Sequence, residues 1–223
     1  MSEALVHVLV INWNGLEHLD ECFSTLLEST YPNVRFVLLE NGSTDGSEAF
    51  VRERFGHDAR VEIVRIEENC GWSGANNAGL ERALAAGADY ALLLNNDTVI
   101  DPGCIAELVA HAERDETIGA LAPKLLLYDM PELINSIGLE ASYIGAAWDR
   151  GLGRLDDARW AEGIGVPGGC GAGYFLRMAA VRKAGLLAAE FEIFLDDYDH
   201  GLRIWEAGYR IETCPRARIR HKY

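Results

Sequence analysis

The sequence YALLLNND, residues 90–97, places a continuous apolar run directly before two asparagines and an aspartate. Similar apolar runs occur earlier, and stretches with helical spacing separate them. Strands are expected at 5–11, 34–39, 61–66 and 90–94, and helices at 16–27, 47–55 and about 75–86. Continuous rather than alternating apolar strands are typical of parallel sheets. We therefore predict an α/β fold with a mostly parallel central sheet and helices on both faces.

The second half of the chain is less regular. Helices are expected over about 103–114 and 197–207, with final strands at 209–211 and 217–219. Residues 118–160 have the pattern of short strands and loops. Neither a repeat nor a linker interrupts the sequence, so residues 1–223 are expected to form a single domain.

The charge of the chain restricts its partners. The 20 Lys and Arg residues are outnumbered by 35 Asp and Glu, which gives a net charge of -15. Such a surface repels nucleic-acid polymers and anionic lipid headgroups. A small phosphorylated ligand is still compatible with it if a cation or backbone N–H groups meet the phosphates.

The cysteines and the apolar runs indicate the compartment. Five cysteines are scattered singly, which is typical of reduced thiols in a cytosol-like compartment. The run at 5–11 is too short for a signal core, and no stretch approaches the ~20 apolar residues of a membrane-spanning helix. We expect a soluble, cytoplasmic protein without a transmembrane segment, which could work at the inner membrane through its acceptor or a partner.

Polar loops follow the predicted parallel strands. Ligands of parallel sheets bind beyond the carboxyl ends of the strands. Three of these loops are rich in Asn, Asp and Gly, and the fourth adds acids to Gly and Asn. They are NWNG (12–15), NGSTDG (41–46), NNDT (95–98) and EENCGWSG (67–74). One edge of the sheet is therefore expected to carry the functional site.

Two acidic motifs are candidates for chemistry. Asp97, at the end of a buried strand, is well placed to hold a hard divalent cation, although the same residues could form an Asx turn. Asp196, Asp197 and Asp199 begin the late helix, where acids also serve as caps. Clustered carboxylates raise one another's proton affinity, which suits a general base.

Glycine and tryptophan residues near these loops have more than one interpretation. The tract GGCGAG, residues 168–173, could cradle a phosphate, let a sugar approach the backbone, or form a tight turn. Trp13 and Trp72 could stack on a base or a sugar, or belong partly to the core. His221, taken alone, favours a structural or incidental role over a ligand role.

Taken in order, five motifs make the chain similar to a known family. They are NWNG (12–15), ENGSTDGS (40–47), NCGWSGANNAG (69–79), NNDT (95–98) and DDYD (196–199). Together they resemble glycosyltransferase family 2, particularly its rhamnosyltransferase-like members with the GT-A (Rossmann-like) fold. The resemblance extends from about Val6 to His221. It implies a nucleotide-binding half at 1–100 and an acceptor and catalytic half at 101–223.

The resemblance also implies roles for individual residues. Asp97 corresponds to the metal-binding acid of the family's DxD element, His221 to a second metal ligand, and Asp197 to the catalytic base, with Asp196 and Asp199 beside it. The residues implied at the nucleotide site are Asn12, Asn14, Glu40, Asn41, Asp45, Asn69, Gly71, Asn76, Asn77 and Asn96. The acceptor and donor-sugar region corresponds to Gly171, Ala172, Gly173 and Tyr174.

Three departures from the family pattern stand out. Glu40 occupies a position that is usually Asp, and Asn95 replaces the first acid of DxD, so the metal site carries less charge. We expect such a site to bind its cation weakly until the diphosphate of the donor arrives. The chain ends two residues after His221, whereas family members usually continue with further helices. Either a compact member or a segment of a longer protein is expected.

The implied activity is inverting transfer of a sugar from a nucleotide-diphosphate donor, dTDP-rhamnose or a UDP-hexose, to a hydroxyl of a glycan or lipid-linked acceptor. It would use Mg²⁺ or Mn²⁺ and would serve cell-surface polysaccharide synthesis. A nucleotidyltransferase is a rival, but its first loop should carry a basic residue, and residues 12–15 have none. A non-catalytic nucleotide- or carbohydrate-binding module is the other rival, and the acidic cluster argues against it.

Overall fold

The computed structural model describes residues 3–191 and 195–223. Within them, nine strands form one sheet in the order β3-β2-β1-β4-β10-β6-β11-β5, with β7 added beside β6. The sheet strands are β1 (Val6–Asn12), β2 (Val34–Asn41), β3 (Val61–Ile66), β4 (Tyr90–Asn95), β5 (Thr98–Ile100), β6 (Ile118–Leu127), β7 (Ile134–Ser136), β10 (Gly173–Arg177) and β11 (Arg210–His221). A separate hairpin pairs β8 (Leu139–Ala141) with β9 (Ala147–Asp149).

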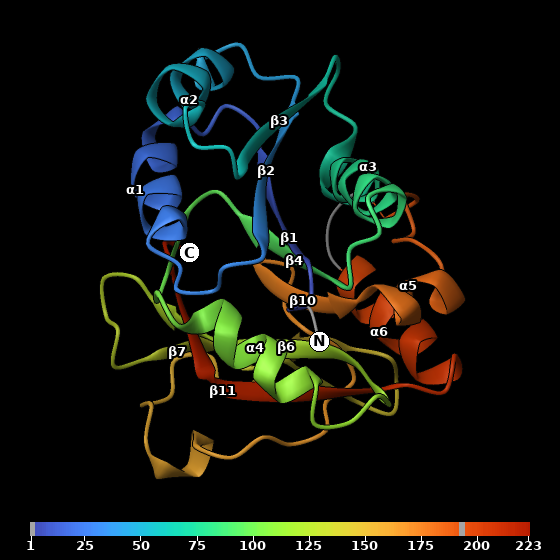
Figure 1. Ribbon diagram of the computed structural model, residues 1–223. Coiled ribbons are helices and arrows are strands. Elements are labelled where there is room, and N and C mark those ends of the chain that lie inside the picture. The colour runs from blue at the N-terminus through green and yellow to red at the C-terminus, as the bar shows by residue number, and fades with distance from the viewer. Residues whose placement is uncertain (1–2, 192–194) are drawn as a thin grey trace.

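Helices cover the sheet on both faces, as predicted (Figure 1). The helices are α1 (Leu16–Leu27), α2 (Ser47–Phe55), α3 (Gly71–Ala85), α4 (Cys104–Ala112), α5 (Met178–Ala184) and α6 (Asp196–Glu206), with a short 3-10 helix at Ala158–Trp160. Apolar residues of α1, α2 and α4 pack with Val6, Val8 and Val10 of β1. Residues of α3, α5 and α6 pack in a second cluster that includes Leu9. Because alternate residues of a strand point to opposite faces, the two clusters lie on opposite sides of the sheet.

The sheet is mostly parallel, which confirms the predicted fold class. Strands β3, β2, β1 and β4 run parallel, and β6 is parallel to β11. Strand β10 is antiparallel to both β4 and β6 and joins the two parallel groups. As a consequence, the residues before β10 lie at the same edge as the residues after β4.

Several predicted boundaries were wrong. Helix α3 begins at Gly71, not near Ala75, because tertiary hydrogen bonds hold its glycine-rich first turn. Ten residues of the region expected to hold short strands form β6, although Gly119 and Pro123 interrupt its apolar pattern. The two expected final strands are one strand, β11, whose register against β6 shifts between Cys214 and Arg218. An irregularity there accommodates Pro215, which cannot donate a ladder hydrogen bond.

Three further observations bear on the sequence-based expectations. Within the described residues, none of the helices is both long and apolar enough to cross a membrane. All five cysteines are free thiols. Trp13 has a side chain that is 58% exposed, so it lies outside the core, whereas Trp72 is partly buried.

Candidate functional site

The parallel strands end together, and their polar loops meet at one edge of the sheet. Strand register pairs Asn12 with Glu40 and Ile11 with Asn95. The backbone N–H of Asn95 donates to the carbonyl of Ala172 at 3.3 Å, which brings the glycine tract to the same edge. The sequence prediction of a single polar edge is therefore correct.

A group of hydrogen-bonded side chains links the loops 12–15, 41–46 and 95–98. The Asn12 amide donates to Glu40 Oε2 at 2.9 Å, and the Asn96 amide donates to Asn12 Oδ1 at 2.6 Å. Glu40 Oε1 accepts from the backbone of Ser43 at 3.1 Å. A side chain at Gly15 would collide with the Asn96 amide, so this close approach requires glycine. Both oxygens of Glu40 are used inside the protein, where they fix the shape of the loops.

The remaining loop residues predicted at the nucleotide site also bind one another. Asn41 Nδ2 donates to Asn69 Oδ1 at 2.9 Å, and Asn69 Oδ1 accepts from the backbone of Gly71 at 2.8 Å. Asn14 Oδ1 accepts from the backbone of Thr44 at 2.9 Å. Together these bonds join the three loops into one surface.

Four predicted residues make contacts inside the protein instead of lining an open surface. Asp45 accepts hydrogen bonds from backbone N–H groups at the starts of α1 and α2, at 2.9 and 3.0 Å, and so caps both helices. Asn76 is fully buried, and the Asn77 amide exchanges two bonds of 2.9 Å with the backbone of Leu187. Tyr174 is likewise fully buried and packs edge-on against His200, so its side chain supports the core.

A cavity of about 400 Å³ lies beside these loops. It brings together residues that are far apart in the sequence. They are Trp72, Asn95, Leu139, Ala147, Trp148, Asp149, Cys170, Gly171, Ala172, Leu195, Asp196, Asp197, His221 and Tyr223. The start of α6, the end of β11, the loop before β10 and the β8–β9 hairpin therefore form its walls.

The three acids at the start of α6 have separate tasks. Asp196 is 7% exposed and accepts from Ser73 Oγ at 2.5 Å, which ties α6 to α3. Asp199 pairs with Arg203 at 2.8 Å, one helical turn later. Asp197 lines the cavity and accepts from the backbone N–H groups of Gly171, at 3.0 Å, and Tyr198, at 2.8 Å.

The environment of Asp197 changes its acidity. Burial and the adjacent charge of Asp196 raise the pKa of Asp197 to about 6, although its two backbone hydrogen bonds oppose the shift. Asp149, on another wall of the cavity, acts in the same direction. Leu195, directly before Asp196, has a left-handed backbone with φ 70°, which is unfavourable for a branched side chain. The helix start is therefore held in a constrained geometry, with a carboxylate whose proton affinity suits a general base.

Asp97 and His221 meet at the end of β11. His221 Nε2 lies 3.3 Å from Asp97 Oδ1, and His221 also lines the cavity. Burial opposes ionisation of Asp97, but the neighbouring His221 outweighs it and lowers the pKa of this carboxyl. Asp97 Oδ1 is buried, and apart from this contact with His221 it has no hydrogen-bond partner among the described residues.

These two residues fit a divalent cation that takes its other ligands from elsewhere. No group of three or more His, Cys, Asp or Glu within the described ranges could hold a metal ion by itself. Mg²⁺ is commonly held by one or two carboxylates together with waters and substrate phosphates. A buried carboxylate oxygen whose one neighbouring polar group is an imidazole nitrogen is compatible with such a shared site.

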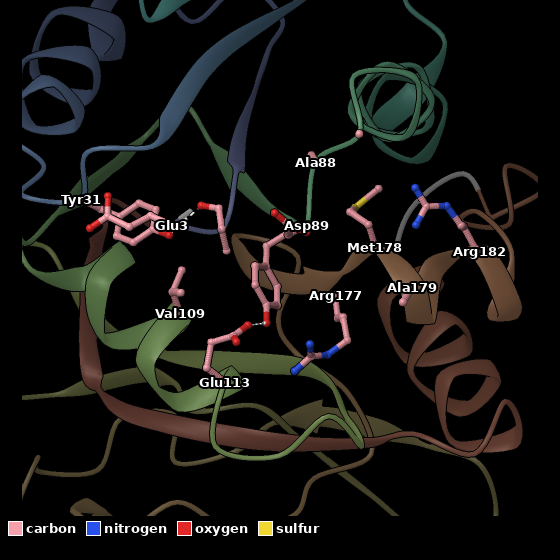
Figure 2. A pocket seen from close by; sticks show the side chains of 13 residues that line it. Glu3, Tyr31, Ala88, Asp89, Val109, Glu113, Arg177, Met178, Ala179 and Arg182 are labelled. Atoms are coloured by element: carbon pink, nitrogen blue, oxygen red, sulfur yellow. Dashed lines mark hydrogen bonds between the residues drawn. The ribbon is translucent and has the colours of Figure 1, made fainter. Parts of the chain in front are cut away.

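A larger cavity, of about 590 Å³, lies at the opposite edge of the sheet and contains none of the predicted residues (Figure 2). Its polar groups bind one another: the Tyr90 hydroxyl contacts the Glu113 carboxylate, and the Arg177 guanidinium donates to the carbonyls of Ala112, at 2.6 Å, and Ile118, at 2.7 Å. The smaller cavity, in contrast, is lined by the predicted residues Asp197 and His221.

Comparison with known proteins identifies the family. Residues 7–180 match the model of glycosyl transferase family 2. The chain belongs to this family. An N-acetylglucosaminyl-diphospho-decaprenol L-rhamnosyltransferase of Mycobacterium tuberculosis is 26% identical over 238 residues, covering 96% of this chain and 75% of that protein. An uncharacterized glycosyltransferase of Haemophilus influenzae is 27% identical over 121 residues, covering 54% of this chain and only 36% of its own length.

Solved structures show the same fold. GalNAc-T7 with UDP, GalNAc and Mn²⁺ superposes with a TM-score of 0.80 at 15% identity, covering 99% of this chain and 44% of that chain. The mannosyltransferase PcManGT from Pyrobaculum calidifontis, in complex with GDP-Man and Mn²⁺, superposes with a TM-score of 0.72 at 19% identity, covering 100% of this chain and 58% of that chain. The family 2 member therefore has the GT-A fold that its motifs predicted.

Sequence reasoning did not single out several residues of the site. Asp149 has a buried oxygen without a partner among the described residues, and Trp148 lines the same cavity. Both belong to the region expected to hold only short strands and loops. Asn135 contacts His221 at 2.8 Å from the short strand β7. A polar residue inside a short apolar segment was the one available signal for Asn135, and it does not specify a partner.

Proposed function

We propose that this family 2 protein transfers a sugar from a nucleotide-diphosphate donor to a hydroxyl of a glycan or lipid-linked acceptor, with inversion at the anomeric carbon. The observation that carries the proposal is the position of Asp197, a carboxylate with a pKa of about 6 in the cavity that His221 also lines. A base of this acidity is ionised at neutral pH and can accept the proton of the attacking hydroxyl.

The proposal divides the work between the two halves of one domain. Residues 1–100 supply the loops that bind the nucleotide. The backbone surface around Asn14, Asn69 and Gly71 belongs to these loops. Residues 101–223 supply Asp197 and the backbone of Gly171, Ala172 and Gly173 on the acceptor and sugar side. The Gly171 N–H orients the base through its bond to Asp197 Oδ2, at 3.0 Å.

Asp97 and His221 would hold Mg²⁺ or Mn²⁺ on the diphosphate side of the cavity. A divalent cation there would stabilise the charge of the departing diphosphate. The mannosyltransferase with GDP-Man and the GalNAc-T7 structure with UDP both contain Mn²⁺, which supports the proposal. The cation would also reconcile an anionic donor with a chain of net charge -15.

The M. tuberculosis relative supports a more specific assignment by its name, which describes an L-rhamnosyltransferase acting on a diphospho-decaprenol compound. We propose dTDP-rhamnose or a UDP-hexose as donor, a role in cell-surface polysaccharide synthesis, and a cytoplasmic site of action close to the membrane that carries the acceptor.

Replacement of the base tests the proposal. Asp197→Asn is expected to lower transfer by about 10²–10⁴-fold, while binding of UDP or dTDP in the presence of Mn²⁺ changes little. Isothermal titration with both nucleotides, with and without Mn²⁺, gives the binding and identifies the preferred base. Glu206→Gln, an exposed carboxylate at the other end of α6, is the matched control.

Three outcomes would contradict the assignment. Normal turnover by Asp197→Asn would show that Asp197 is not the catalytic base. Nucleotide binding by the wild-type chain without donor hydrolysis or transfer would favour a binding module. Formation of a nucleotide sugar from a nucleoside triphosphate would favour a nucleotidyltransferase.

A further inference from the structure

Asn135 lies behind the proposed metal site. It is the central residue of β7, which pairs with β6 beyond the main run of the sheet. Its side chain is 1% exposed, and the flanking Ile134 and Ser136 are fully buried. A buried amide in such a strand needs a hydrogen-bonding reason for its presence.

The partner of Asn135 is His221. Asn135 Oδ1 lies 2.8 Å from His221 Nδ1. A carbonyl oxygen can only accept a hydrogen bond, so this contact places a proton on Nδ1. In the neutral ring, the lone pair then resides on Nε2, the nitrogen that lies 3.3 Å from Asp97 Oδ1.

The stability of β7 does not explain why residue 135 is an asparagine. Asn135 Nδ2 has no hydrogen-bond partner among the described residues, which makes the buried amide unfavourable for folding. A leucine of similar size would avoid this penalty. The hydrogen bond to His221 is therefore the feature that accounts for an asparagine at this position.

We propose that Asn135 is a positioning residue for divalent-cation binding: its side-chain oxygen fixes the ring and the tautomer of His221 so that Nε2 is available as a ligand next to Asp97. This inference rests on the proposed function, because it assigns Asp97 and His221 to the cation. Partners that hold the second nitrogen of a ligating histidine commonly change metal affinity by about 10–100-fold when they are replaced.

Two substitutions separate positioning from simple packing. Asn135→Leu removes the acceptor, whereas Asn135→Asp keeps an acceptor of the same shape and cannot donate a hydrogen bond when ionised. Ser136→Ala, at the next and equally buried position of β7, is the matched control because Ser136 Oγ donates to the Gly138 carbonyl and not to the site. Circular dichroism and thermal unfolding establish that each variant is folded.

The measurement is Mn²⁺ affinity of the full chain by electron paramagnetic resonance, with Mn²⁺ alone and with Mn²⁺ plus UDP or dTDP. Asn135→Leu should weaken Mn²⁺ binding by about 10–100-fold, while Asn135→Asp and Ser136→Ala stay within about threefold of wild type. Nitrogen chemical shifts of His221 in the metal-free chain should show a proton on Nδ1 in wild type and Asn135→Asp, and loss of that preference in Asn135→Leu.

The experiment distinguishes failure of the positioning role of Asn135 from failure of the metal assignment. Mn²⁺ binding in Asn135→Leu that equals wild type, or a loss in Asn135→Asp as large as in Asn135→Leu, would overturn the positioning role alone. A wild-type chain that binds no Mn²⁺ under any of these conditions would overturn the metal assignment in the proposed function, and the positioning role with it.

Discussion

The two edges of the central sheet carry similar residue types but use them differently. At the amino-end edge, the cavity contains Glu113, Tyr90 and Arg177, and all three bind other protein groups (Figure 2). At the carboxyl-end edge, Asp149 keeps a buried oxygen without a partner in the described chain, and the buried Asp97 Oδ1 has only the ring nitrogen of His221 beside it, at 3.3 Å. The two edges therefore differ in how far their buried polar groups are satisfied, and the larger cavity is the one whose named groups are bound to other protein groups.

The physical reason lies in the strand direction. Loops after parallel strands converge at one edge, where backbone and side-chain groups have no further strand to pair with. At the other edge, Arg177 reaches the last carbonyls near α4 and fills the hydrogen-bonding capacity of that region. Substitutions at the carboxyl-end edge should therefore lower transfer activity, whereas substitutions at the amino-end edge should leave transfer activity unaltered.

Among the substitutions that compare the two edges, the largest expected effect comes from Asp97. Asp97→Ala should lower transfer at least about 10²-fold, since a bound cation supplies several kcal/mol of charge stabilisation, and the remaining activity should no longer respond to Mn²⁺. Initial rates across a Mn²⁺ titration check this. Asp89→Asn, at the amino-end edge, is the matched control, and an equal loss there would break the comparison between the edges.

The pH dependence of stability should reveal Asp197. Its pKa in the folded chain is about 6, against 3.8 for the ordinary group. The native state therefore holds a proton that the unfolded state releases, and stability is lost as pH rises from about 4 to about 6. The shift corresponds to about 3 kcal/mol, which solvent screening reduces to about 1–3 kcal/mol.

Urea unfolding of wild type and Asp197→Asn between pH 4 and 7 measures this difference. The wild-type chain should lose stability relative to the variant as pH rises, and kcat/KM should rise with pH through about 6 as the base ionises. Parallel stability curves for the two chains would contradict the raised pKa.

A smaller effect is expected from removing the hydrogen bond between Ser73 of α3 and Asp196 of α6. Ser73→Ala removes the hydroxyl that donates to Asp196 at 2.5 Å and should lower the free energy of unfolding by about 1–2 kcal/mol. A double-mutant cycle with Asp196→Asn isolates the pair. Additive effects in that cycle would show that the two helices are held together by other contacts.

The smallest effect should come from Arg182, which borders the amino-end cavity with an exposed side chain. Arg182→Ala should change the free energy of unfolding by no more than about 0.5 kcal/mol and leave transfer unaltered in the same assays. A clear loss of transfer would show that the larger cavity has a function of its own.

Much of this architecture followed from local sequence. Apolar runs separated by helical spacing predicted the parallel strands β1 to β4, and the loops after them predicted the polar edge. The ordered motifs predicted the family, which the match over residues 7–180 confirms. The roles assigned to individual residues, including Asp97 and Asp197, stay predictions until the variants are measured.

The sequence determined the elements that depend on neighbours along the chain, because periodicity, turns and strand ends are local properties. Only the tertiary structure decided how the acids of the α6 cluster differ. Ser73 and Arg203 engage Asp196 and Asp199, whereas Asp197 lines the cavity and accepts hydrogen bonds from backbone N–H groups. It also decided that Asn135 reaches His221, 86 positions away in the sequence. Such contacts depend on strand register and helix packing across the whole sheet, which no short segment of sequence encodes.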